Sequence, residues 1–241
     1  DEYKELGFVA TKNGELVFLS LSDGKVIKKE ALPGLGETEI SSSYVSRNNR
    51  LYAFGTDDGR IIPVRTAYSV SFSGDKRTIT PEVSEDNILQ VSDSPLVRIA
   101  FEENDGETAS AGAAYTAGGE LILKTVAKSR GLIGGGGSDE ATHNLTDTLG
   151  GGKVTALEID RALQNLYVGT DTGRVYRYNI RNRQNPELLE TLDATGNSRI
   201  PVTALGFLLG DRSLVVGDEA GSVSVWFEVA DPDSPGGKVF K

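Results

Sequence analysis

Short apolar segments alternate with turn residues along most of the chain, and this pattern predicts β-strands. Leu6–Ala10 is apolar, Asn13-Gly14 is a strong hairpin signal, and Glu15–Ser20 follows as a second expected strand. A second turn at Asp23-Gly24 leads into another expected strand, Lys25–Leu32. No segment has the spacing of an amphipathic helix, so we expect an all-β protein.

A repeated frame near the C-terminus predicts how these strands are organised. Val154-Thr-Ala-Leu157 recurs as Val202-Thr-Ala-Leu205, forty-eight residues later. In both copies a second apolar run carries two glycines four residues apart, Gly169 with Gly173 and Gly217 with Gly221. A period in the forties, with several short strands in each unit, is typical of a β-propeller blade.

The same frame can be followed back through the chain. Leu51–Ile62 matches both copies, with Tyr68–Phe72 and Arg77–Val83 expected as outer strands of that unit and Pro63 as a bulge or strand end. We therefore predict a single WD40- or quinoprotein-like propeller domain over residues 1–241, with about five to seven four-stranded blades and a ring that is complete or incomplete. The readable blades are expected at about 1–36, 37–90, 91–130, 150–195 and 196–241.

Residues 131–152 are rich in glycine and are expected to form a flexible loop. Gly134–Ser138 has the composition of a natural loop and also of an artificial linker, and the sequence leaves both readings open. His143, the one histidine, falls in this loop and is expected to be solvated.

Composition limits the partners and the chemistry that can be expected of this chain. The chain has 35 acidic against 25 basic residues, a net charge of −10, so nucleic acid is not expected as a partner. It has no cysteine, which excludes disulfides, thiolate metal sites and thiol nucleophiles. No apolar run reaches the roughly 18 to 20 residues that a membrane helix needs.

Acidic residues and glycines recur in patterns that resemble binding sites. The acidic residues Asp57, Asp58, Asp171, Asp218 and Glu219 all occupy the turn of the repeat without the spacing of a calcium loop, so we interpret them as turn residues. Gly150–Thr155 lacks the hydroxyl directly after lysine that a phosphate loop requires.

The remaining candidates are a tryptophan and a set of arginines. Trp226, the one tryptophan, is expected to pack between blades. Four arginines are candidates for an anion-binding or partner-binding surface, although ordinary solvated residues are the expected reading: Arg130, Arg174, Arg177 and Arg199. No catalytic, cofactor-binding or metal-binding residue is predicted, and the ligand-binding residues stay undefined.

The segment Leu205–Val229 resembles the extracytoplasmic insert of phosphate ABC transporter permeases of the Pst type, with Leu214-Val-Val-Gly-Asp218 and Gly221–Phe227 as the most specific part. The resemblance is strongest over residues 154–241 and implies a WD40-like propeller whose sequence continues in the family beyond the Trp-Phe segment. Asn13–Leu19 is also similar to repeats of quinoprotein-like propellers, including an outer-membrane assembly scaffold.

These resemblances imply a non-catalytic domain on the periplasmic side of the bacterial inner membrane, in a parent protein embedded in that membrane. Its expected role is interaction or regulation, with the phosphate-binding protein or other transporter subunits as partners and no cofactor. The alternative is an independent periplasmic scaffold for protein–protein interaction. A quinoprotein enzyme is not expected, because the chain has one tryptophan and no cysteine pair.

Overall fold

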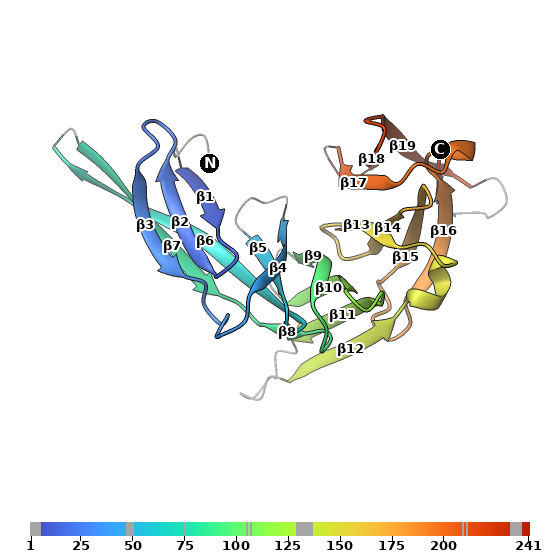
Figure 1. Cartoon of the computed structure of the whole chain (residues 1–241), viewed down its shortest axis with the longest axis horizontal. Coiled ribbons are helices and arrows are strands. Elements are labelled where there is room, and N and C mark those ends of the chain that lie inside the picture. Colours follow the sequence, from blue (N-terminus) through green and yellow to red (C-terminus); the bar gives the residue numbers. More distant parts are fainter. Residues whose placement is uncertain are drawn as a thin grey trace. The chain divides into compact units, whose positions relative to one another are not determined.

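The computed structural model describes residues 6–46, 51–74, 76–104, 106, 108–128, 137–208, 210, 212–231 and 238–241. Strands dominate this part of the chain (Figure 1), and its two helical segments are short 3₁₀ turns, η2 (Thr146–Leu149) and η3 (Gly196–Ser198). The all-β class predicted from the alternating pattern is confirmed. Within the described residues no helix is long and apolar enough to span a membrane.

The strands form five antiparallel sheets that follow one another along the chain. The first contains β1 (Leu6–Ala10), β2 (Glu15–Ser20) and β3 (Val26–Ala31). The second contains β4 (Ile40–Val45), β5 (Leu51–Thr56), β6 (Arg60–Ser73), β7 (Lys76–Glu85) and the short β8 (Leu89–Gln90).

The other three sheets have four strands each. The third contains β9 (Leu96–Glu103), β10 (Ala109–Thr116), β11 (Leu121–Lys128) and β12 (Ser138–Asn144). The fourth contains β13 (Val154–Ile159), β14 (Asn165–Thr170), β15 (Arg174–Asn179) and β16 (Glu187–Asp193). The fifth contains β17 (Val202–Phe207), β18 (Ser213–Asp218), β19 (Val223–Ala230) and β20 (Lys238–Phe240).

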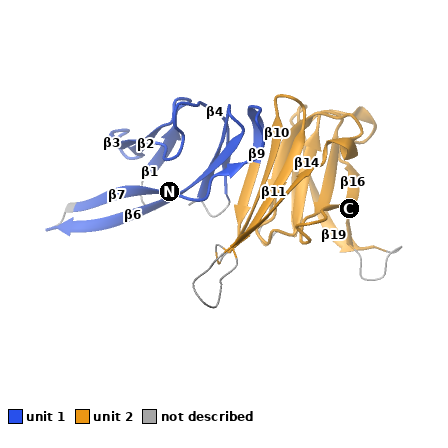
Figure 2. Cartoon of the chain, turned by 90° about the horizontal axis from the view of Figure 1, so that it is seen from below, with its two compact units in different colours: residues 1–99 blue, residues 100–241 orange. Residues whose placement is uncertain are grey.

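The chain divides into two compact units, residues 1–99 and residues 100–241 (Figure 2). One hydrophobic cluster of the first unit joins its two sheets and includes Leu16, Phe54 and Val64. A cluster of the second unit joins the fourth sheet to the fifth and includes Tyr167, Val202 and Phe240. The single domain expected over residues 1–241 stays a prediction.

The same turn recurs in every sheet and explains the repeat. A glycine with positive φ closes each turn, and these glycines are Gly14, Gly59, Gly119, Gly173 and Gly221. In the first three sheets a threonine three residues earlier accepts a hydrogen bond from the backbone N–H that follows the glycine; for Arg60 N and Thr56 Oγ1 the distance is 2.9 Å. Because this turn occurs once in every sheet, it shows which strands of the different sheets are equivalent.

By this correspondence the described part of the first sheet lacks the strand that comes first in each of the other four sheets. β1 precedes its turn as β5, β10, β14 and β18 precede theirs, so the described residues hold no first-sheet counterpart of β4, β9, β13 and β17. Four strands were expected in each blade. The first sheet has three described strands, and the second has five because β8 pairs with β6.

The structure corrects the expected loop over residues 131–152 and the third blade expected to end near residue 130. Ser138–Asn144 is the outer strand of the third sheet, β12, which pairs with β11 along its whole length. η2 and the positive-φ Gly150 and Gly151 then lead into β13. Of the Gly134–Ser138 segment, residues 134–136 lie outside the described residues. The glycines on either side of β12 led to the prediction of a loop, but the strand itself has no glycine and is held by its pairing with β11.

Pro63 is neither a bulge nor a strand end, because β6 continues through it, opposite Ala53 of β5. Its carbonyl accepts a hydrogen bond from Asp86 N, so its nitrogen faces the same side of the strand. On that side β6 pairs with β7 from Val64 onward and with β8 up to Ile61. Pro63 lies between these two pairings, where the strand needs no backbone N–H donor.

Candidate functional site

The hairpin of β6 and β7 extends beyond the rest of its sheet (Figure 1). Ten successive residue pairs join the two strands, from Val64 opposite Glu85 to Ser73 opposite Lys76. We call its outer part, residues 67–74 and 76–80, the arm. The sequence predicted Tyr68–Phe72 and Arg77–Val83 as strands, but not that β6 runs unbroken from Arg60 to Ser73.

The arm has one apolar and one polar face, because successive side chains of a strand point to opposite sides. Tyr68, Val70 and Phe72 share a face, and Val70 lies directly opposite Ile79 of β7. The other face carries Ser69, Ser71 and Ser73. Phe72 is 71% exposed and Val70 is 37% exposed. Phe72 is among the most exposed large apolar side chains of the described residues.

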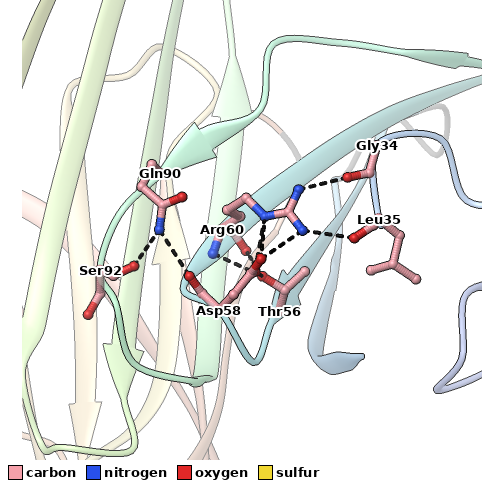
Figure 3. A network of polar contacts seen from close by, with 7 residues as sticks. All are labelled: Gly34, Leu35, Thr56, Asp58, Arg60, Gln90 and Ser92. Atoms are coloured by element: carbon pink, nitrogen blue, oxygen red, sulfur yellow. Dashed lines mark hydrogen bonds and ion pairs between the residues drawn. The ribbon is translucent and has the colours of Figure 1, made fainter. Parts of the chain in front are cut away.

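A polar network holds the start of β6, the end of the strand opposite the arm (Figure 3). Arg60, the first residue of β6, donates through Nη1 and Nη2 to the carbonyls of Gly34 and Leu35, at 2.7 and 2.8 Å. Its Nε donates to Asp58, and Thr56 bonds the same carboxylate. The connection before β4 is thus tied to the turn from which β6 starts.

Two further contacts hold the arm where it leaves the sheet. Lys28 of β3 donates through Nζ to the carbonyl of Pro81 at 3.1 Å, and Arg65 forms an ion pair with Asp86 at 3.2 Å. The arm therefore projects from a fixed base, as residues of a binding surface require.

In the second unit, Arg177 of β15 lies in a charged cluster between the fourth and fifth sheets. It is 7% exposed. Nη2 lies 2.9 Å from Glu228 Oε1, Nη1 lies 3.7 Å from Glu190 Oε2, and Nε donates to Asn165 Oδ1 at 3.1 Å. The ring of Phe240 stacks on the guanidinium, 5.0 Å from its centre. The expected solvated arginine is instead buried and forms ion pairs with two glutamates.

The electrostatics of the cluster follow from its burial. Burial raises the pKa of Glu190 despite the hydrogen bond from Phe240 N and the nearby Arg177. Burial also acts on Glu228, but hydrogen bonds from Lys238 and Arg177 outweigh it and lower the pKa of that carboxyl.

A cavity of about 670 Å³ opens beside the cluster. Charged side chains of both signs line it, with Arg177, Arg181 and Lys238 against Asp160, Glu228 and Asp231. Two carboxylates flank the Arg177 guanidinium, and their negative charge opposes the approach of an anion. The cluster therefore joins the two sheets and is a poor phosphate site.

The other residues singled out from the sequence lie in turns or against the hydrophobic core. Asp58, Asp171 and Asp218 accept hydrogen bonds within or next to their own turns, as the turn interpretation predicted. Trp226 packs on the cluster between the fourth and fifth sheets, which confirms its expected place. Across the described ranges, no three His, Asp or Glu side chains gather as a metal ion requires.

His143 is half-buried on β12, and its Nε2 lies 2.6 Å from the carbonyl of Arg183, so its expected solvation is wrong. Gly150–Thr155 connects η2 to β13, with Gly152 N bonded to the carbonyl of Leu149. Arg174 and Arg199 are exposed, whereas Arg130 lies outside the described residues.

No family model matches the chain, and no curated protein matches it. Among solved structures, the β-propeller domain of Cps50 (Swd1) from Myceliophteria thermophila is similar, with 16% sequence identity and a TM-score of 0.54. The match covers 100% of this chain and 68% of that chain. The fold predicted from the repeat is thereby confirmed, and the chain is an all-β protein of the β-propeller type.

Proposed function

We propose that this chain is a non-catalytic protein-interaction domain that binds its partner through the apolar face of the arm. The observation that carries the proposal is the 71% exposure of Phe72, beside Val70, on a hairpin that Lys28 and Arg65 hold where it leaves the sheet. Exposed aromatic side chains on rigid supports are typical centres of protein interfaces. The serine face behind them gives the arm a solvated side.

The parent protein that fits best is a phosphate ABC transporter permease, with this domain on the periplasmic side of the inner membrane. The support is the resemblance of Leu205–Val229 to the extracytoplasmic insert of those permeases. In that setting the partner is the phosphate-binding protein or another transporter subunit. The charge-compensated cluster at Arg177 supports docking of a protein over capture of phosphate by the domain itself.

Titration calorimetry of the purified domain tests this proposal, first with the phosphate-binding protein and then with phosphate alone. We expect saturable binding of the protein and none of phosphate. Phe72→Ser should weaken binding about tenfold or more, because truncating a central interface side chain typically costs above 1 kcal/mol. Ser71→Ala, on the opposite face of the same strand, is the matched control and should leave affinity unchanged.

Three results would count against parts of the proposal. Binding of phosphate alone would make the domain a ligand sensor. Binding of the protein with equal affinity by Phe72→Ser would remove the arm from the interface. Binding of neither would favour the alternative, an independent periplasmic scaffold with another protein partner.

A further inference from the structure

The fourth and fifth sheets place equivalent residues in opposite environments. Because their sequences repeat every forty-eight residues, Gly169 corresponds to Gly217 and Val175 to Val223. Val175 is 0% exposed, whereas Val223 is 70% exposed. The difference has a visible cause within the second unit. The fifth sheet covers this side of the fourth, and in the described part of residues 100–241 no further sheet covers the same side of the fifth.

The glycines show what the covering element is. A Cβ atom on Gly169 would lie 2.6 Å from Val202, on the first strand of the next sheet. A Cβ atom on Gly55 of the second sheet would lie 2.3 Å from Ser42 Oγ of its own sheet. It would also lie 3.0 Å from Ile99, which is on the first strand of the sheet that follows. A Cβ atom on Gly217 would meet only Ala204 of its own sheet, at 3.4 Å. At Gly55 and Gly169 the space above the glycine is therefore occupied by a strand of the next sheet. At Gly217 no strand of the described residues occupies the equivalent space.

The uncovered side is also more apolar than its covered counterpart. Val215, Val225 and Phe227 stand where the fourth sheet has Tyr167, Arg177 and Asn179. Register and alternation put one set of side chains together, which we call the open face: Val215, Gly217, Val223, Val225, Phe227 and Val229. Phe227 is 55% exposed and Val225 is 39% exposed. Contiguous apolar surface of this kind marks an interface.

We infer that the open face packs against the first strand of a further blade-like sheet of the same polypeptide, with a β-branched side chain seated over Gly217 as Val202 is seated over Gly169. The interface type is the one already present between the fourth and fifth sheets. The similar propeller domain agrees in size, because 68% of it is covered by this chain and about a third has no counterpart here. This inference is independent of the arm and its partner.

Thiol labelling tests the inference cleanly because the chain has no cysteine. Val223→Cys puts a single thiol on the open face, and its rate of reaction with a maleimide reports access. Val175→Cys, at the covered equivalent position, is the slow control. We expect the Val223→Cys thiol to react fast in residues 1–241 alone, and about tenfold or more slower in the complete polypeptide purified without partner proteins.

Equal rates for Val223→Cys in the two proteins would overturn the inference. A rate in residues 1–241 that falls as their concentration rises would also overturn it, because the occupant would then be a second copy. An appended second copy of residues 196–241 gives a separate measurement, since it brings its own Val202. It should slow the reaction about tenfold, and Val202→Asp in that copy should restore the fast rate. A folded appended copy that leaves the rate unchanged contradicts the inference.

Discussion

Arg177 of β15 and Glu228 of β19 are joined across two sheets by a 2.9 Å contact between Nη2 and Oε1. The side chain of Arg177 is 8% exposed and that of Glu228 is 21% exposed. Removing one member of a buried ion pair leaves an uncompensated charge, which costs far more than losing a surface pair.

Arg177→Ala should therefore lower the free energy of unfolding by about 3 kcal/mol, because Glu190 and Glu228 lose their common partner. Urea denaturation measures the change. Arg174→Ala, an exposed arginine on the same strand, is the control and should stay within about 0.5 kcal/mol of the native chain. Equal losses for the two variants would show that the ion pairs do not stabilise the sheet interface.

The two carboxylates of this cluster should respond to pH in opposite directions. The pKa of Glu228 is lowered in the folded chain, so its stabilising contribution is present above the ordinary value of 4.5 and is lost as pH falls through the lowered value. The pKa of Glu190 is raised, so its contribution is complete below 4.5 and is lost as pH rises through the raised value.

Glutamine substitution separates these effects, because glutamine resembles a protonated glutamate. Glu228→Gln should destabilise the chain at about pH 7 and much less at about pH 4, whereas Glu190→Gln should be neutral or stabilising at about pH 7. Denaturation midpoints at both pH values provide the measurement. A loss of the same size for both variants at neutral pH contradicts the opposite pKa shifts.

Gly169→Ala and Gly217→Ala make a matched pair in residues 1–241. At Gly169 the added methyl lies 2.6 Å from Val202 Cγ1, so we expect a loss of about 1–3 kcal/mol through overpacking. At Gly217 the nearest atom is at 3.4 Å, and the change should stay within about 0.5 kcal/mol. Thermal denaturation distinguishes the two, and similar losses would mean that the sheets do not pack as described.

A second pair of glycines separates backbone strain from steric overlap. Gly59 has φ +81° and Gly221 has φ +83°, but a Cβ atom on Gly59 would lie 1.8 Å from Ser92 O while one on Gly221 meets nothing within 4 Å. Gly221→Ala should cost about 1–2 kcal/mol for the left-handed conformation alone. Gly59→Ala should cost more than about 3 kcal/mol, because the Ser92 backbone must move. Near-equal denaturation midpoints for these variants would refute the overlap.

The repeated frame made the propeller predictable, because each residue type that recurs in the frame meets a local structural requirement. Gly173 supplies a positive φ, and the apolar run Leu166–Gly169 is buried on both sides. Trp226 was placed correctly for the same reason, since a large aromatic side chain in a strand needs an apolar neighbour.

The site could not be predicted in this way. Arg177 was read as solvated because its partners, Glu190 and Glu228, are remote in sequence and meet it only through sheet packing. The alternation of serine with Tyr68, Val70 and Phe72 was a usable signal for the arm, since it indicates a strand with one apolar face. β12 was missed because its hydrogen bonds depend on β11 and not on its own composition.

Val202 belongs to the fifth sheet but is buried against Gly169 of the fourth, so neither sheet has a complete core by itself. Stability in such an arrangement is a nearest-neighbour property, in which each interface couples two consecutive sheets. Local unfolding of β17 would expose part of the fourth sheet to solvent, as well as part of the fifth. Unfolding should therefore spread inward from uncovered sheets, and hydrogen exchange should be slowest where a sheet is covered on both sides.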